Sequence, residues 1–341
     1  MCGITGFFKP QGMDGPLAGQ SILKMTDSLI HRGPDDSNTY SDFSSNLYLG
    51  HRRLSIIDTS KGGLQPMTSQ SGNLVIAFNG EIYNHQELRS EIEKEYASIQ
   101  WRSTSDTETL LAAFEHWGIE KTLPMIRGMF AIALWDCLNQ ELFIIRDRFG
   151  EKPLYYGWID SGESSTFGFA SELKALRKYP CFSNKLSKQA LIQYFSYMYV
   201  PCPLSIYEGI FKLEPGCILK ISSKPPQNKP KNIPHSSGGK TYKHENLSIY
   251  KWYDLREAVN QASQNLFTDY NEASNALEKE LSKVIKMQSL ADVPLGAFLS
   301  GGVDSSSIVA LMQKQNSQPI KTFTIGFEDR EFDESPFAAS V

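Results

Sequence analysis

Cys2 is the first residue of this chain that could act as a catalytic nucleophile. It follows the initiator methionine and precedes a glycine and an apolar run, in the sequence MCGITGFF. Removal of Met1 would leave Cys2 with a free α-amino group beside its own thiol. Such an amine has an ordinary pKa of about 8, so a single residue would supply both a nucleophile and a base.

Four short polar stretches offer partners for this thiol. They are HRGPDD at 31–36, HRRLSIID at 51–58, FNGEIYN at 78–84 and STSDTE at 103–108. Each also has a purely structural interpretation. Asn79-Gly80 is typical of a hairpin turn, Asp106 at a helix start fits an N-cap, and a strand arginine fits an exposed sheet edge.

Taken together with Cys2, these stretches contain one residue for each task of an amide hydrolysis. The oxyanion formed by thiol attack needs two fixed donors, for which the Asn79 side chain and the Gly80 N–H are suited. An amino-acid substrate needs an arginine for its α-carboxylate and a carboxylate for its α-ammonium. Arg53 and Asp106 fit these two tasks. The set predicts hydrolysis of an amino-acid carboxamide.

A second motif, LSGGVDSS at 299–306, has the composition of a phosphate-binding loop. Gly301 and Gly302 allow close approach of the backbone to an anion, and the helix expected after them favours negative charge at its N-terminus. The loop lacks the lysine of the common P-loop, and a serine-rich helix cap is the structural alternative. Because Asp304 would repel phosphate, we expect a divalent cation, Mg²⁺, to mediate.

The length of 341 residues predicts two domains. Apolar runs typical of strands alternate with turns up to about residue 220, and helices are expected at 21–33, 105–118 and 186–199. A Pro-, Lys- and Ser-rich stretch follows at 223–245. After a helix at 271–290, the order strand, glycine-rich loop, helix, strand predicts a doubly wound α/β domain.

Composition excludes several classes of protein. The net charge of −4 and pI of about 5.9 show no basic footprint for nucleic acid. No apolar run reaches a membrane span, and no signal peptide is apparent. Five cysteines, an odd number without a C-x-x-C pair, argue against a disulfide framework. We expect a protein of a reducing, cytoplasmic compartment.

These motifs carry a family resemblance. The N-terminal half resembles the class II, or N-terminal nucleophile, glutamine amidotransferase domain, and SGGVDSS resembles the loop of ATP pyrophosphatases. In this order they are similar to the glutamine-hydrolysing asparagine synthetase family. The resemblance implies an α+β four-layer α/β/β/α sandwich at 2–218, a linker at 219–248 and the N-terminal part of a doubly wound ATP pyrophosphatase domain at 249–341. We expect that domain to need residues beyond 341.

The resemblance also implies roles for individual residues. Cys2 would form a γ-glutamyl thioester, with Asn79 and Gly80 as its oxyanion pair. The glutamine-binding residues it implies are Arg53, Leu54, Ser55, Ile56, Ile57, Asn79, Gly80, Glu81 and Asp106. The ATP-binding residues it implies are Phe298, Ser300, Gly301, Gly302, Asp304, Ser305, Ser306 and Ile325, with Asp304 as the metal ligand. Phe298 departs from the leucine usual in the family. The stretch RDRFGEKPLYY at 146–156 is interpreted as mainly structural.

The implied activity is glutamine-dependent synthesis of an amide, with ATP and Mg²⁺ as cofactors. Glutamine hydrolysis would release ammonia, which would displace AMP from an adenylated carboxylate. Aspartate is the usual acceptor in the family, and homodimers are common. A different acceptor, such as a sugar acid, and a binding module without synthesis are the alternatives. We expect residues 1–341 to hydrolyse glutamine without completing the synthesis.

Overall fold

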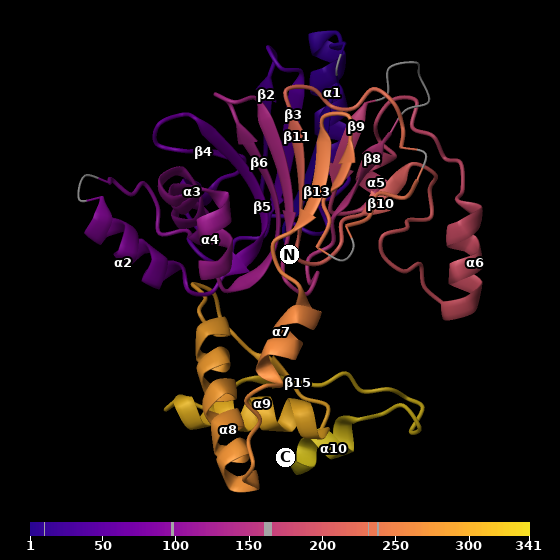
Figure 1. Ribbon diagram of the computed structural model, residues 1–341. Helices are drawn as coiled ribbons and strands as arrows, with labels where there is room; N and C mark the ends of the chain where they lie inside the picture. Colours follow the sequence, from indigo (N-terminus) through magenta and orange to yellow (C-terminus); the bar gives the residue numbers. More distant parts are fainter. Residues whose placement is uncertain (10, 97–98, 160–165, 231, 237–238) are drawn as a thin grey trace. The chain divides into compact units, whose positions relative to one another are not determined.

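The computed structural model describes residues 1–9, 11–96, 99–159, 166–230, 232–236 and 239–341, which form two compact units, Met1–Arg256 and Glu257–Val341 (Figure 1). The boundary lies later than the sequence predicts. Most of the predicted linker belongs to the first unit, because residues 217–222 and 242–251 form strands of one of its sheets. Residues 231 and 237–238 of that linker lie outside the described residues.

The first unit contains two antiparallel sheets. The first has the strand order β10-β8-β9-β1-β3-β2 and the second the order β12-β13-β11-β7-β6-β5-β4. The first sheet consists of β1 (Gly3–Phe8), β2 (Asp36–Asp42), β3 (Leu47–Arg53), β8 (Tyr155–Trp158), β9 (Phe167–Ala170) and β10 (Ile210–Lys212). The second consists of β4 (Met67–Thr68), β5 (Leu74–Ile82), β6 (Gly128–Asp136), β7 (Glu141–Arg146), β11 (Cys217–Ser222), β12 (Tyr242–His244) and β13 (Leu247–Lys251).

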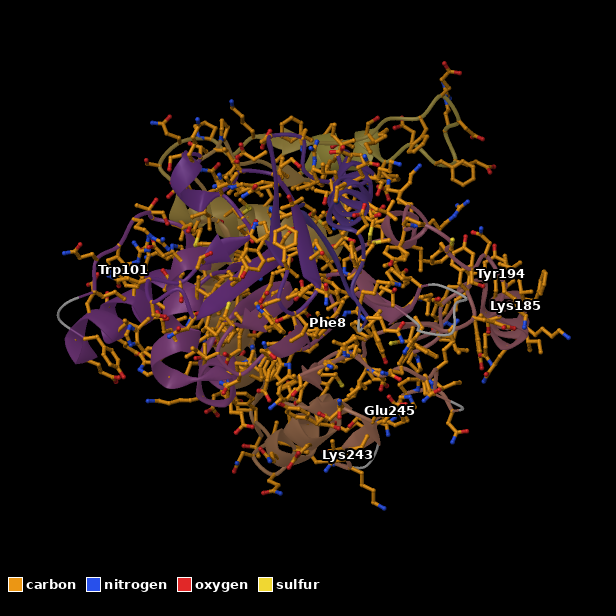
Figure 2. All side chains as sticks on the ribbon, turned by 90° about the horizontal axis from the view of Figure 1, so that it is seen from above. Phe8, Trp101, Lys185, Tyr194, Lys243 and Glu245 are labelled. Carbon is orange, nitrogen blue, oxygen red and sulfur yellow. The ribbon has the colours of Figure 1, made fainter. Side chains whose placement is uncertain are left out.

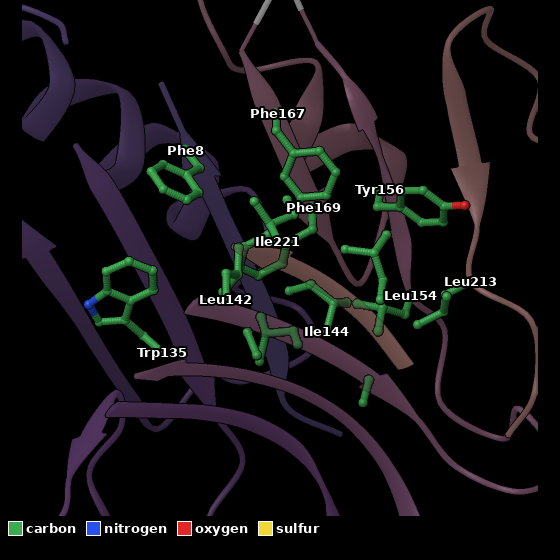
Figure 3. Packing of buried hydrophobic residues seen from close by; sticks show 14 of the residues in the cluster. Phe8, Trp135, Leu142, Ile144, Leu154, Tyr156, Phe167, Phe169, Leu213 and Ile221 are labelled. Atoms are coloured by element: carbon green, nitrogen blue, oxygen red, sulfur yellow. The ribbon is translucent and has the colours of Figure 1, made fainter. Parts of the chain in front are cut away.

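The two sheets pack face to face around the largest hydrophobic core. Figure 3 shows Phe8 and Phe169 of the first sheet opposite Trp135, Ile144 and Ile221 of the second. Side chains alternate between the faces of a strand, so every second residue of a central strand enters this core. The remaining side chains point to the helical layers.

Helices cover the outer face of each sheet. The helices α1 (Gly15–Asp27) and α5 (Leu173–Leu176) pack on the first sheet, while α2 (His85–Glu95), α3 (Asp106–Trp117) and α4 (Ile119–Met125) lie against the second. Ile76 and Phe78 of β5 face these helices. The predicted α/β/β/α sandwich is confirmed, as is the burial of its central strands on both faces.

Three features that the sequence predicts can be compared with the structure. The helix expected at 21–33 begins earlier and ends at Asp27, because Pro16 occupies its first turn, where a proline is favourable. Asn79 and Gly80 lie within β5, opposite Ala131 and Phe130, and not in the turn that the sequence predicts. The helix expected at 186–199 is α6 (Lys188–Tyr197), whose Tyr194 lies at the edge of the molecule in Figure 2.

The second unit has the predicted strand–loop–helix–strand order. Strands β14 (Ala297–Phe298) and β15 (Thr322–Phe323) pair in parallel, with α9 (Val303–Gln315) as the crossover between them. Its other helices are α8 (Tyr270–Gln288) and α10 (Ser335–Ser340), and α7 (Leu255–Ala262) begins at the unit boundary. Among the described residues, no helix is long and apolar enough to cross a membrane.

Candidate active site

A pocket with about 580 Å³ of empty space, part of it open to solvent, lies where the chain enters β1 and beside the C-terminal half of β5. It brings together all the predicted glutamine-binding residues but one. Those that line it, together with the predicted nucleophile Cys2, are Arg53, Leu54, Ile56, Ile57, Asn79, Gly80, Glu81 and Asp106. Ser55 does not, and its N–H donates to Asp35 Oδ2 over 2.8 Å.

The Cys2 thiol is held against the backbone that follows β3. The Leu54 N–H donates to Sγ over 3.4 Å, and Arg32 Nε fixes the Cys2 carbonyl over 2.8 Å. Burial raises the pKa of the thiol above its ordinary value, so the neutral thiol is the resting form. Burial also lowers the pKa of the N-terminal amine, which here belongs to Met1. This thiol needs a base, and an amine of lowered pKa suits that task.

Asn79 projects from β5 toward the first sheet. It shares its side of the strand with Ala77, which lies in the core between the sheets. Its side chain is 0% exposed, and neither Oδ1 nor Nδ2 has a hydrogen-bond partner among the residues that the structure describes. A buried amide without partners is costly for the fold and rare in native proteins. Because Asn79 also lines the pocket, its amide is a candidate donor to a bound oxygen.

The edge of β5 supplies the second donor. β4 pairs with β5 only at Val75 and Ile76, so the edge beyond is open. There the Phe78 N–H donates to Gln65 Oε1 over 2.7 Å, and the Ile82 N–H to Asp106 Oδ2 over 2.9 Å. Backbone groups alternate in direction along an antiparallel strand, so the N–H of Gly80 points to the same edge between them. It faces the pocket that Gly80 lines.

Two carboxylates line the pocket, that of the buried Asp106 and that of the half-buried Glu81. Asp106 is the first residue of α3, and Ser105 rather than Asp106 caps the helix by accepting the Glu108 N–H over 3.2 Å. Burial raises the pKa of Asp106, and burial together with the Asp106 charge raises the pKa of Glu81. Two such carboxylates gain from a cation between them, as the α-ammonium of an amino acid would be.

Arg53 lines the pocket and also closes a loop. Its guanidinium donates to the carbonyls of Ser60 over 2.8 Å and of Asp58, and lies 3.3 Å from Asp36 Oδ2. Gly63 makes this possible, because a side chain there would collide with the guanidinium. Holding the loop is a structural task, and the binding of a substrate carboxylate by Arg53 stays a prediction.

Sequence reasoning missed several residues of this pocket. They are Met1, Gly63, Gln65, Phe78, Ser105, Thr107, Met129 and Lys152. Lys152 belongs to RDRFGEKPLYY, the stretch interpreted as mainly structural. That interpretation fits Arg146, which donates to the carbonyls of Lys152 and Gly150 over 2.8 and 2.7 Å. It does not extend to the Lys152 side chain, which enters the pocket from a loop that no local pattern connects to Cys2.

The predicted ATP site forms the N-terminal end of α9. Gly301 has a φ of +81°, and a side chain there would meet the backbone of Phe337. Ser300 Oγ and Ser305 Oγ lie 2.9 Å apart and close the loop, while the buried Ser306 Oγ has no partner within the described ranges. Phe298 and Ile325 are 78% and 66% exposed, and Gly302 and Asp304 are also exposed. Within the described chain no cluster of three acidic, histidine or cysteine residues suits a metal ion.

Comparison with known proteins gives a match over most of the chain. Residues 1–230 match the family model of a glutamine amidotransferase domain, and residues 276–341 match that of asparagine synthase. The chain is 34% identical to asparagine synthetase 1 (glutamine-hydrolysing) of Bacillus subtilis, with 98% of this chain and 47% of that protein covered. It is 33% identical to the glutamine-hydrolysing asparagine synthetase B of Escherichia coli, over 94% and 46%. The chain spans about half the length of the curated relatives that it matches.

Among solved structures, the glutamine phosphoribosylpyrophosphate amidotransferase of B. subtilis covers 97% of this chain and 68% of its own, at 17% identity and a TM-score of 0.49. The four-layer sandwich, with a cysteine at the entry to a central strand, is the fold class of the N-terminal nucleophile hydrolases. More narrowly, the chain belongs to the glutamine amidotransferase domain family, which matches two thirds of its length.

Proposed function

We propose that the first unit hydrolyses glutamine at Cys2 and releases ammonia for the synthesis of asparagine. The observation that carries this proposal is Asn79, whose buried amide has no partner in the described part of the chain and which lines the same pocket as Cys2. An unpaired amide lowers stability, and its chemistry there is that of an oxyanion donor.

The reaction follows from the groups around the pocket. After removal of Met1, the Cys2 amine takes the thiol proton while Sγ attacks the side-chain carbonyl carbon of glutamine. Asn79 Nδ2 and the Gly80 N–H stabilise the oxyanion, which collapses as the amine returns the proton to the departing ammonia. Water then attacks the γ-glutamyl thioester and yields glutamate and the free thiol.

Substrate choice follows from charge. Asp106 and Glu81 would bind the α-ammonium of glutamine, and Arg53 its α-carboxylate. Leu54, Ile56 and Ile57 line the apolar part of the pocket. A free ammonium ion lacks the carboxylate and the chain length to use both charged ends, so the pocket favours glutamine over ammonium.

The second unit extends the proposal to amide synthesis. The loop from Ser300 to Ser306 suits the phosphates of ATP, and one carboxylate, Asp304, suits Mg²⁺, which takes most of its ligands from phosphates and water. Bound Mg-ATP would activate an acceptor carboxylate as an adenylate. Relatives named asparagine synthetases favour aspartate as that acceptor over another acid. We further propose a cytoplasmic location and a homodimer.

The deciding experiment measures ammonia and glutamate released from glutamine by the chain with Met1 removed. We expect Cys2→Ser and Cys2→Ala to lose the activity, and a variant that retains Met1 to lose it as well. Cys181→Ser, at an exposed cysteine, is the matched control and should keep full activity. Turnover by Cys2→Ala at the rate of the unmodified chain would refute the assignment of the nucleophile.

A further inference from the structure

Lys152 is a buried cation in the catalytic pocket to which the proposed reaction assigns no task. It is 5% exposed and lines the pocket together with Met1, Cys2 and Glu81. In the described ranges of the chain, its ammonium makes no hydrogen bond and no ion pair. A lysine is almost never buried without a partner, so this position requires an explanation.

The loop that carries Lys152 is fixed on both sides of the residue. Asp147, which is fully buried, accepts the N–H groups of Phe149, Glu151 and Lys152 over 3.0, 2.9 and 3.1 Å. The Lys152 carbonyl accepts Arg146 Nε over 2.8 Å. The fixed backbone of this loop therefore determines where the Lys152 side chain lies in the pocket. A lysine on the surface would not need a backbone fixed in this way.

The N-terminal amine, which in this structure is that of Met1, is one of the groups on which this charge acts, beside the carboxylates of Glu81 and Glu151. The charged groups that face it are the Cys2 thiol from the start of β1, Arg32 after α1, Glu81 of β5 and Lys152 from the loop before β8. Arg53 of β3 and Asp106 of α3 act on the neighbouring thiol. Glu81 favours protonation of the amine, whereas the two cations oppose it.

Arg32 has other engagements. It donates to the Cys2 carbonyl and, over 3.0 Å, to Glu172 Oε1, so a nearby carboxylate largely offsets its charge. Among the described residues Lys152 forms no ion pair, although the carboxylates of Glu81 and Glu151 act on its charge. Together with Arg32, this charge opposes that of Glu81 at the amine, in a pocket where burial strengthens electrostatic effects.

We propose that Lys152 is a positioning residue of the glutaminase, whose buried ammonium holds the amine of Cys2 in the neutral form that accepts the thiol proton. This inference rests on the proposed function. It assigns Lys152 no contact with the reacting atoms, so its substitution should act through the protonation of the amine. The glutaminase activity lost on removal of the Lys152 charge should therefore be regained at higher pH.

The test compares pH profiles of kcat/KM for the chain with Met1 removed. In Lys152→Met we expect the acidic limb to move up by about one pH unit, with activity regained at high pH. Lys152→Arg should keep the limb of the unmodified chain, and Lys178→Met, the same change at an exposed position, should leave the whole profile unchanged. An unshifted limb in Lys152→Met, or a loss by one factor at every pH, would overturn the proposal.

A second measurement does not depend on glutamine turnover. Acylation of the N-terminal amine, followed by mass spectrometry of its peptide across a range of pH, should show the same upward shift in Lys152→Met. Lys152→Gln provides a polar substitute should the methionine variant fail to fold, and the same shift is expected. No shift in either variant refutes the role of Lys152. An unmodified chain that turns over no glutamine refutes the proposed function instead.

Discussion

Asn79 and Asn84 lie five residues apart, are 0% and 6% exposed, and differ in their hydrogen bonds. Asn84 Nδ2 donates to Met125 O over 3.0 Å and its Oδ1 accepts the Arg127 N–H over 2.8 Å, whereas no described residue pairs with the Asn79 amide. We therefore expect Asn79→Leu to raise the free energy of unfolding by about 1 kcal/mol, because it removes two unpaired buried groups. The same change should lower kcat for glutamine by about 10²- to 10³-fold.

Asn84→Leu is the matched control for this prediction. It leaves a carbonyl and an N–H unpaired, so we expect a loss of about 2 kcal/mol in the free energy of unfolding. Urea unfolding measures the free energy of unfolding of both variants, and glutaminase assays measure their kcat. Destabilisation by Asn79→Leu equal to that by Asn84→Leu would mean that the Asn79 amide is paired in solution.

Glu172 links the position of Cys2 to pH. Burial alone would raise the pKa of this carboxyl, but hydrogen bonds from His31, Arg32 and Lys174 outweigh burial and lower it to about 2. A lowered pKa means that ionised Glu172 stabilises the fold above its ordinary pKa of 4.5, and that this contribution is lost as the pH falls toward 2. The Arg32 that it holds also fixes the Cys2 carbonyl.

We therefore expect Glu172→Gln to lower the free energy of unfolding at pH 7. The difference from the unmodified chain should shrink as the pH falls below 4.5. Urea unfolding at pH 7, 5 and 3 measures it, with Glu91→Gln at an exposed position as the control. A difference that stays constant over this range would show that the ionisation of Glu172 does not contribute.

At the scale of the elements, the close contact of α1 with β3 depends on a glycine, Gly50, which has no side chain. A methyl group on Gly50 of β3 would collide with Thr26 Oγ1 and lie 3.3 Å from Ile22 Cδ1, both on α1. We expect Gly50→Ala to cost about 1 to 3 kcal/mol through overpacking. Gly19→Ala, on α1 itself, meets no atom within 4 Å and should stabilise by about 0.5 to 1 kcal/mol. Thermal or urea unfolding of the two variants should give opposite signs.

The elements also explain which parts of the site could be predicted. Cys2, Asn79 and Asp106 were predictable because each lies at an element end or within a motif of distinct composition. Their convergence requires the pairing of β1 with β3 and the stacking of two sheets, which no local pattern contains. Ser55 fell outside the pocket because its N–H bonds to Asp35, a contact across 20 residues. Lys152 was missed for a similar reason, since the Asp147 carboxylate determines where it points.

The strands after residue 216 show a limit of composition as a guide to domains. The stretch at 223–245 is rich in proline, lysine and serine, which is typical of a linker. However, β11 and β13 pair with each other on either side of it, and β11 pairs with β7. Apolar residues of these strands, such as Leu219 and Ile249, are buried in the core between the two sheets. The stretch is an insertion between paired strands.

Each residue that lines the catalytic pocket belongs to the first unit, and so does the core between the sheets. In the second unit, the buried apolar residues among those described are few, namely Ile285, Leu299, Met312 and Ala338. A small core contributes little to stability. We therefore expect residues 1–256 alone to fold, with a thermal midpoint near that of the longer chain, and to hydrolyse glutamine with kcat/KM within about threefold, since no pocket contact is removed. The comparison needs matched preparations with Met1 removed. A loss of more than tenfold in the shorter chain would show that the second unit takes part in the glutaminase reaction.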